Sequence, residues 1–273
     1  MLVNRIKQRF ESLRQQDRKA LIPYVVLGDP AKDVTLPVMH ALVESGADII
    51  ELGVPFSDPS AEGPVIQKAH ERALSNGSSL RDALALVKQF RETDSVTPVL
   101  LMGYANPIER MGYESFVEKA VESGVDAVLT VDLPPEEAEE FNEQLKEAGL
   151  ENIFLIAPTS THERQKMVAN MAGGFIYYVS LKGVTGAGHL DLDSVRANVT
   201  HIRSLTELPV CVGFGIKDGA SARAVAELSD GAVVGSVVVN QIAELAEKGE
   251  ADPAIYAKAV SAIIADMRKA LDS

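Results

Sequence analysis

Short apolar runs, each closed by a turn rich in Gly, Pro, Ser or Asp, recur along the whole chain. Runs of this kind are typical of strands that are buried on both faces of a parallel sheet. They predict eight strands, at residues 21–27, 47–52, 98–102, 125–131, 152–156, 174–179, 209–213 and 231–234. Between them, apolar residues at helical spacing predict helices at 33–45, 79–92, 112–123, 135–148, 161–172, 191–206, 218–229 and 237–271.

Strands that alternate with helices indicate a parallel sheet covered by helices. Eight such units favour a closed barrel over an open doubly wound sheet. We therefore expect an α/β protein with a single (β/α)₈ TIM barrel domain over residues 1–273. Extra helices are expected after strand two, at 64–75, and after strand eight. An amphipathic N-terminal helix is predicted by the spacing of Leu2, Ile6, Phe10 and Leu13.

The composition excludes several classes of partner. A formal net charge of −13 argues against nucleic acid or an anionic membrane, so an anionic substrate must be held by local donors. The single cysteine, Cys211, excludes an internal disulfide, and its apolar surroundings predict a buried side chain. No apolar run is long enough to span a bilayer, and the N-terminus lacks the apolar core of a signal peptide. We expect a cytoplasmic protein.

The stretch ADIIELGVPFSDPSAEGPVIQ, residues 47–67, carries the strongest candidate for chemistry. In a strand over 47–52, Glu51 shares a face with the apolar Ala47 and Ile49. An ionised carboxylate there is costly unless it is paired or its pKa is raised, so Glu51 is a candidate for proton transfer. The alternative is a glutamate that ends a strand and points into water.

Glycine-rich turns are candidates for a phosphate site. They lie at 183–186 (GVTG), 213–215 (GFG) and 235–236 (GS), and the last two follow strands seven and eight. The active sites of such barrels lie at these strand ends, where bare N–H groups and a helix that begins at Ser236 can bind phosphate without Lys or Arg. Ordinary tight turns are the alternative.

Six segments together resemble the tryptophan synthase α subunit family. They are ELGVPFSDPSAEGPVIQ, LMGYANPI, DLPPEE, VSLKGVTG, GFGI and GS, in this order along nearly the whole chain. The resemblance implies a lyase that cleaves indole-3-glycerol phosphate to indole and D-glyceraldehyde 3-phosphate, without a cofactor or a metal. It also implies an α2β2 complex in which indole passes to a pyridoxal-phosphate β subunit.

The resemblance also implies roles for single residues. Glu51 and Glu62 match the two catalytic carboxylates. The residues expected to bind the substrate are Tyr24, Met102, Tyr104, Tyr177, Thr185, Gly186, Phe214, Gly215, Gly235 and Ser236. Those expected at or near the contact with the β subunit are Pro55, Asp58, Pro59 and Asp132. Two features depart from the family pattern: Glu replaces the usual Asp at 62, and Leu181-Lys182 precedes the Gly-Val-Thr-Gly segment.

The cleavage reaction explains why two carboxylates are needed. It requires a proton on indole C3, loss of the indole N–H proton and removal of a proton from the side-chain hydroxyl. Glu51, if its pKa is near neutral, can both give and take protons. Glu62, expected on a more exposed loop, can accept the indole N–H and stabilise positive charge.

Two other interpretations remain open. A different phosphosugar barrel, an epimerase or isomerase, would need metal-binding histidines or an Asp pair at strand ends. The histidines at 40, 70, 162, 189 and 201 lie in predicted helices or at loop margins, so we expect no metal site. A barrel that has lost activity and serves only as a partner protein is the second, and the intact Glu51 argues against it.

Overall fold

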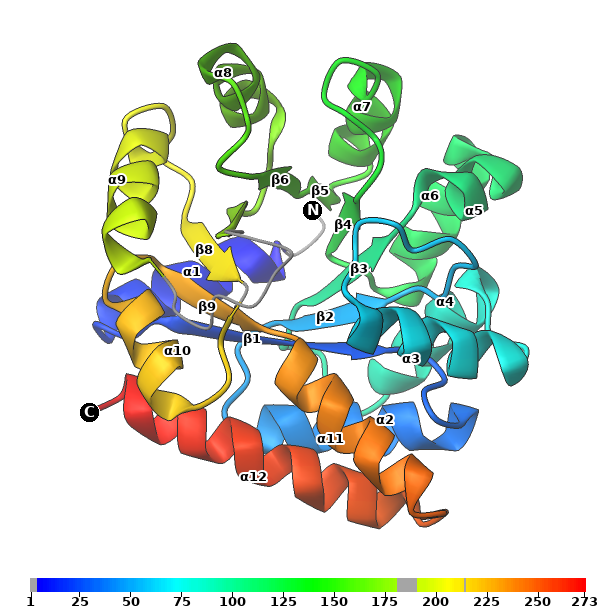
Figure 1. The fold of residues 1–273 in the computed structure, drawn as a ribbon. Coiled ribbons are helices and arrows are strands. Elements are labelled where there is room, and N and C mark those ends of the chain that lie inside the picture. The colour runs from blue at the N-terminus through cyan, green and yellow to red at the C-terminus, as the bar shows by residue number, and fades with distance from the viewer. Residues whose placement is uncertain (1–3, 181–190, 214) are drawn as a thin grey trace.

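The chain folds around a closed sheet of parallel strands (Figure 1). The computed structural model describes residues 4–180, 191–213 and 215–273. The strands are β1 (Ala20–Val26), β2 (Ile50–Gly53), β3 (Val99–Gly103), β4 (Ala127–Thr130), β5 (Glu151–Asn152), β6 (Phe154–Ile156), β7 (Ile176–Val179), β8 (Val210–Gly213) and β9 (Gly231–Val234). Their order is β5-β4-β3-β2-β1-β9-β8-β7-β6. Only Ile153 separates the two end strands, and its N–H donates to Val128 O at 2.8 Å, so the sheet closes as a (β/α)₈ barrel.

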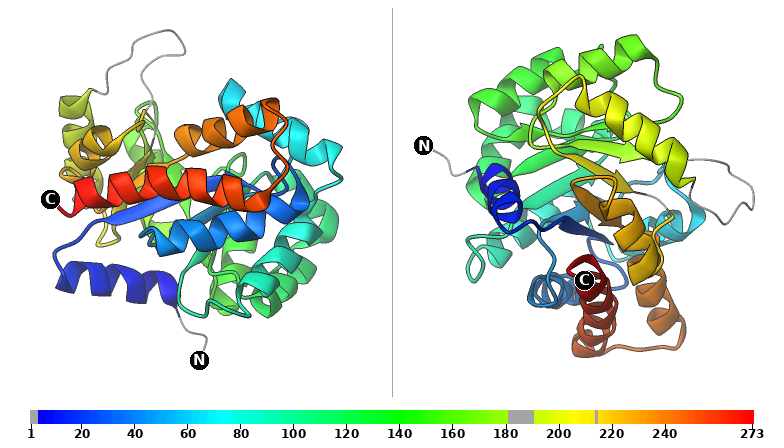
Figure 2. Two further views of the ribbon diagram at one scale, coloured as in Figure 1. Left: turned by 90° about the horizontal axis from the view of Figure 1, so that it is seen from below. Right: turned by 90° about the vertical axis from the view of Figure 1, so that its left-hand side faces the viewer.

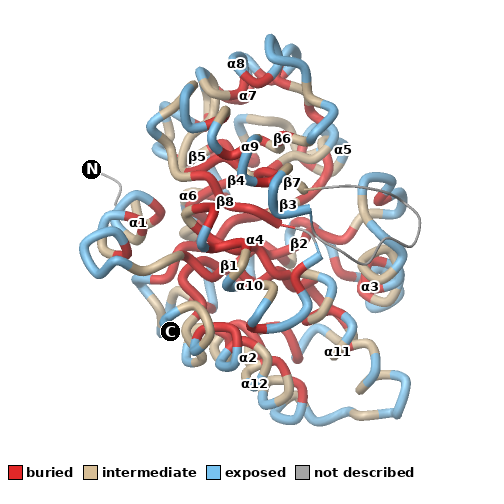
Figure 3. Tube along the Cα trace, turned by 60° about the vertical axis from the view of Figure 1, so that its left-hand side comes forward, coloured by how far each residue is buried: buried red, intermediate tan, exposed pale blue. Residues whose placement is uncertain are grey.

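Helices surround the barrel and expose their outer faces (Figures 1 and 3). They are α1 (Arg5–Gln15), α2 (Lys32–Glu44), α3 (Pro64–Ser75), α4 (Leu80–Phe90), α5 (Ala105–Met111), α6 (Tyr113–Ser123), α7 (Glu139–Glu147), α8 (His162–Met171), α9 (Leu192–Arg203), α10 (Gly219–Ala226), α11 (Ser236–Glu247) and α12 (Pro253–Leu271). The predicted fold class is therefore confirmed, including the N-terminal helix and the added helix at 64–75.

Several predicted boundaries were wrong for local reasons. The strand predicted at 47–52 begins at Ile50, because Ala47 follows the turn that ends α2. The strand predicted at 152–156 is divided at Ile153, where the chain passes from pairing with β4 to pairing with β7.

Two helix predictions were also incomplete, and a third helix was missed. The helix predicted from residue 135 begins at Glu139, because Pro134 and Pro135 accept turn hydrogen bonds from Glu137 and Ala138. The region 237–271 forms two helices, separated by a turn in which Gly249 has a φ of 77°. The short helix α5 was not predicted.

The apolar core has two layers. The outer layer packs the helices against the sheet and contains Ile50 and Leu52 of β2. The inner layer fills the barrel and joins strand residues such as Ile22 and Ile49 to side chains of α1, including Phe10. Because Ile22 lies in the first half of β1 and Ile49 comes immediately before β2, α1 closes the amino-terminal end of the barrel. The carboxyl ends of the strands remain for the site.

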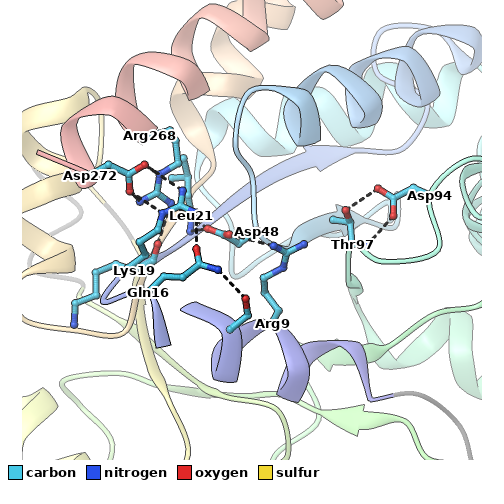
Figure 4. A network of polar contacts seen from close by, with 11 residues as sticks. Arg9, Gln16, Lys19, Leu21, Asp48, Asp94, Thr97, Arg268 and Asp272 are labelled. Carbon is cyan, nitrogen blue, oxygen red and sulfur yellow. Dashed lines mark hydrogen bonds and ion pairs between the residues drawn. The ribbon is translucent and has the colours of Figure 1, made fainter. Parts of the chain in front are cut away.

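A buried ion pair fastens the last helix to the barrel (Figure 4). The Asp48 carboxylate accepts hydrogen bonds from Leu21 N–H at 2.9 Å and from the Arg268 guanidinium at 3.1 Å. Burial raises the pKa of Asp48, and the positive charge of Arg268 opposes that shift. Arg268 also donates to the Lys19 carbonyl at 2.9 Å. These contacts hold α12 beside α2, as both views in Figure 2 show.

Candidate active site

Glu51 lies inside the barrel. Its neighbours in β2, Ile50 and Leu52, point to the outer core, so strand alternation turns Glu51 inward. It is in register with Tyr24 of β1 and Leu100 of β3, and only 1% of its surface is exposed. Among the described residues, its Oε1 atom has no hydrogen-bond partner.

This environment changes the acidity of Glu51. Burial, and secondly the negative charge of Glu62, raise the pKa of Glu51 from 4.5 to about 8. The side chain is therefore mostly protonated at neutral pH, yet close enough to its pKa to lose the proton during a reaction. A group of this kind can act first as an acid and then as a base.

Glu62 lies on an exposed loop, as expected, but its own side chain is enclosed. Its neighbours Ala61 and Gly63 are exposed, whereas the Glu62 side chain is only 4% exposed. Its Oε2 atom lies 3.3 Å from His70 Nε2 and 3.5 Å from the Tyr24 hydroxyl. The hydroxyl is itself 3.2 Å from the same histidine nitrogen. Glu62 is thus held by two side chains at the mouth of the barrel.

His70 was not among the residues predicted for the site, because it lies in a helix and does not end a strand. In α3, however, Ile66, Ala69 and Ala73 recur at helical spacing and pack toward Tyr24, and His70 lies on the same face. His70 is 1% exposed. This periodicity was the signal that could have placed it in the site.

The loop between β2 and α3 is fastened to His70 and Tyr104. Phe56 N–H donates to His70 Nδ1 at 3.0 Å, and the Phe56 ring stacks on Tyr104 with centroids 4.9 Å apart. The Tyr104 hydroxyl accepts a hydrogen bond from Ala61 N–H at 3.2 Å. These contacts position Glu62, which follows Ala61, relative to the strand ends.

Two glycines make room for tyrosine hydroxyls. A Cβ atom at Gly53 would lie 2.3 Å from the Tyr24 hydroxyl, and one at Gly213 would lie 2.3 Å from the Tyr177 hydroxyl. Burial raises the pKa of both tyrosines well above the usual value, so each hydroxyl keeps its proton and can donate. The packing of Tyr177 therefore explains the first glycine of the 213–215 turn. Met102, from β3, packs partly buried between the inner core and Tyr24.

The segment at 235–236 has the geometry that phosphate binding needs. Ser236 begins α11 and Gly235 is its N-cap, so the first N–H groups of this helix have no partner within it. A Cβ atom at Gly235 would meet other atoms only at 3.7 Å or more, at ordinary contact distance, and its φ is −111°. The fold itself does not require glycine there. Gly215 is exposed with a φ of 76°.

The roles of the remaining predicted residues stay predictions. Thr185, Gly186 and Phe214, and the Leu181-Lys182 departure, lie outside the described residues. Pro55 and Pro59 are buried, whereas Asp58 and Asp132 are exposed. Asp132 accepts a hydrogen bond from Ala105 N–H at 2.7 Å, at the start of α5. This contact is a turn-capping role for Asp132, and the expected contact with a β subunit stays a prediction.

No metal centre is visible in the part of the chain that the structure describes: no three His, Cys, Asp or Glu side chains there are arranged to hold an ion. No helix of the described residues is long and apolar enough to cross a membrane. The residues that converge at the strand ends are two carboxylates, three tyrosines and one histidine.

A closed parallel barrel that encloses a carboxyl group of raised pKa has the features of an enzyme of the TIM-barrel class. Comparison with known proteins makes this specific. The sequence profile of the tryptophan synthase alpha chain family matches residues 10–270. The chain belongs to this family.

Individual relatives agree over nearly the full length. The tryptophan synthase alpha chain of Nitrosococcus oceani is 55% identical over 271 residues, which cover 99% of this chain and 98% of that one. The alpha chain of Thioalkalivibrio sulfidiphilus is 56% identical over 270 residues, covering 99% and 100%. The crystal structure of the tryptophan synthase alpha subunit from Legionella pneumophila superposes with a TM-score of 0.91 at 44% identity, over 99% of each chain.

Membership of this family establishes the overall reaction of the protein. The protein is a lyase of tryptophan biosynthesis that catalyses the α reaction of tryptophan synthase, and its family name implies a β chain as partner.

Proposed function

We propose that Glu51 and Glu62 carry out the aldol cleavage of indole-3-glycerol phosphate to indole and D-glyceraldehyde 3-phosphate, with Glu51 as both acid and base. The observation that carries this proposal is the buried Glu51 carboxyl, which has an unpartnered Oε1 and a pKa raised to about 8. A protonated carboxyl at neutral pH can give its proton to indole C3, which starts the reaction.

Glu62 supplies charge. Protonation at C3 leaves positive charge on the ring nitrogen, and an ionised carboxylate that accepts the N–H hydrogen bond stabilises it. The Glu51 carboxylate then takes the proton of the side-chain hydroxyl. The bond between C3 and the glycerol chain breaks, its electrons return to the ring, and the hydroxyl carbon becomes the aldehyde. Glu51 ends the cycle protonated, as it began.

The remaining site residues divide between the two ends of the substrate. Tyr24, Met102, Tyr104 and Tyr177 surround the carboxylates at the strand ends and line the indole pocket. The N–H groups at the start of α11, with Gly235 and Ser236, hold the phosphate, and Gly215 borders the same end. Thr185, Gly186 and Phe214 complete the site in this proposal on sequence grounds alone.

The proposal extends to the assembly. The chain acts as one barrel domain over residues 1–273 in a cytoplasmic α2β2 complex, and indole passes to the β subunit. Pro55, Asp58, Pro59 and Asp132 surround the mouth of the barrel and form or adjoin the contact.

A cleavage assay tests the function. Purified chain, alone and with saturating β subunit, is mixed with indole-3-glycerol phosphate, and indole and glyceraldehyde 3-phosphate are quantified. We expect both products in equal amounts, with a rate that a metal chelator does not change. A folded chain that makes neither product in the presence of the β subunit would contradict the proposal, and a chelator-sensitive rate would favour a metal-dependent barrel.

A further inference from the structure

Among the described residues of the site, His70 is a titratable side chain to which the proposed mechanism gives no task. It is fully enclosed, and both ring nitrogens have partners. Phe56 N–H donates to Nδ1 at 3.0 Å, so Nδ1 is an acceptor and carries no proton. The proton of the neutral ring must then lie on Nε2, which faces the Glu62 carboxylate.

We infer that His70 is a positioning residue: its Nε2–H donates to the Glu62 carboxylate and fixes that group at the mouth of the barrel. The inference rests on the proposed role of Glu62. The Tyr24 hydroxyl completes the arrangement, because it lies near both the histidine nitrogen and Glu62 Oε2 and can donate to the carboxylate. His70 itself does not need to touch the substrate.

The Glu62 carboxylate is enclosed, but the loop that carries it is exposed, so a hydrogen bond to a fixed partner orders the side chain. Its neighbours Ala61 and Gly63 are small and exposed, and Glu has one more rotatable bond than Asp. A freely rotating carboxylate would lose side-chain entropy each time it met the indole nitrogen. A hydrogen bond in the free enzyme orders it beforehand, which is how positioning contributes to rate.

His70 can serve this purpose because its own helix is rigidly attached. Two residues further along α3, Arg72 donates to both carboxylate oxygens of the buried Asp29, at 2.6 and 2.9 Å. Ala69 and Ala73 are fully buried on either side of His70 along the helix. The contacts therefore run without a gap from the loop after β1, through α3 and His70, to Glu62.

Two substitutions distinguish the contributions of the two ring nitrogens of His70. The amide nitrogen of His70→Gln reaches as far as Nε2 and can still donate to Glu62, whereas the shorter His70→Asn can only replace Nδ1. We expect His70→Asn to lower kcat for indole-3-glycerol phosphate about tenfold with KM changed less than about twofold. His70→Gln should stay within about threefold of wild type.

A double-mutant cycle assigns the effect to Glu62. In a Glu62→Gln background, His70→Asn should lower kcat by less than about twofold more, because the carboxylate that it positions is already gone. A further tenfold loss there would overturn the inference, as would equal activities of His70→Asn and His70→Gln. His40, which stacks on Phe90 outside the barrel with centroids 5.0 Å apart, supplies the matched control. Its Asn and Gln variants should leave kcat unchanged.

A measurement without turnover separates this inference from the proposed function. Nitrogen-edited NMR of the folded chain should show His70 as the Nε2–H tautomer, and Glu62→Ala should shift that proton resonance. An Nδ1–H tautomer would overturn the inference even in an active enzyme. An inactive wild-type chain with the expected spectrum would instead overturn the proposed function and leave the contact in place.

Discussion

At the scale of single residues, the site depends on a contrast between two carboxylates. Glu51 has an oxygen with no partner among the described residues, and its pKa is raised to about 8. Glu62 lies against His70 and Tyr24 and adds negative charge close to Glu51. In the proposed mechanism, the first side chain exchanges protons and the second stabilises positive charge.

The charge of Glu62 can be tested directly. Glu62→Gln keeps the shape and removes the charge, so we expect kcat with saturating β subunit to fall at least about tenfold, or about 1.4 kcal/mol. Glu62→Asp keeps the charge and should retain much of the activity. Because the charge of Glu62 contributes to the raised pKa of Glu51, the limb of the pH–rate profile that reports Glu51 should move to lower pH in Glu62→Gln. Equal kcat values for wild type and Glu62→Gln would remove the role.

Burial of Glu51 predicts a pH-dependent stability. Its pKa is about 8 in the folded chain and near 4.5 when unfolded, so between these values the folded chain holds a proton that the unfolded chain releases. The free energy of unfolding therefore falls as the pH rises across this window. Glu51→Gln, neutral throughout, should gain on the order of 3 kcal/mol relative to wild type between about pH 5 and about pH 9.

Urea unfolding at the two pH values measures this difference. Glu122→Gln, on the exposed face of α6, is the control and should show no such gain. A Glu51→Gln difference that does not grow with pH would mean that the folded chain does not raise the pKa of Glu51.

At the scale of helices and strands, the ends of strands and the first residues of helices determine the shape of the site. Gly53 and Gly213 end β2 and β8 and leave room for the hydroxyls of Tyr24 and Tyr177 from the neighbouring strands. Gly235 is different, because no atom of the residues that the structure describes lies closer than 3.7 Å to a Cβ atom built there. A glycine that the fold does not need fits a place where a ligand approaches the backbone.

This difference predicts the effect of substitutions at 235. Gly235→Asp should fold, since a Cβ atom meets no close neighbour, but its charge should repel the phosphate. We expect KM for indole-3-glycerol phosphate to rise at least about tenfold with a smaller change in kcat. Gly235→Ala, without the charge, should show a smaller rise. An unchanged KM in Gly235→Asp would place the phosphate elsewhere.

The helices and strands also show which parts of the fold and the site the sequence could predict. The barrel followed from apolar periodicity, which directly reflects burial, and the helix at 64–75 from the long gap between strands two and three and from Pro64 as a first-turn residue. The break at Ile153 did not, because it depends on which neighbour each half of the segment pairs with. The role of His70 was missed for a similar reason: a polar residue on a buried helix face can be interpreted only when its partner across the loop is known.

At the scale of the whole molecule, the two ends of the barrel have separate tasks. α1 closes the amino-terminal end with apolar side chains, while the carboxyl end carries the reactive groups and the loops. The loop from β2 to α3 is already fastened through Phe56 to His70 and Tyr104. Exposed Asp58 and Asp132 lie on loops at the same end, where a partner can act on the chemistry.

This arrangement predicts activation by the partner. A β subunit that contacts these loops should favour their catalytic arrangement and raise the rate of cleavage. Titration of a fixed amount of this chain with β subunit should therefore raise kcat to a plateau at one β per α. Asp58→Ala should weaken the response without lowering the basal rate. A rate that saturating β subunit leaves unchanged would contradict activation through the loops.

Glu51 transfers the protons in the proposed mechanism, and the cleavage rate of Glu51→Gln is the decisive measurement of that role. The substitution is nearly isosteric and removes only the ability to give and take a proton. With saturating β subunit, we predict that kcat falls by at least about 10²-fold while KM stays within about threefold of wild type. A folded Glu51→Gln chain that cleaves indole-3-glycerol phosphate at close to the wild-type rate would contradict the mechanism.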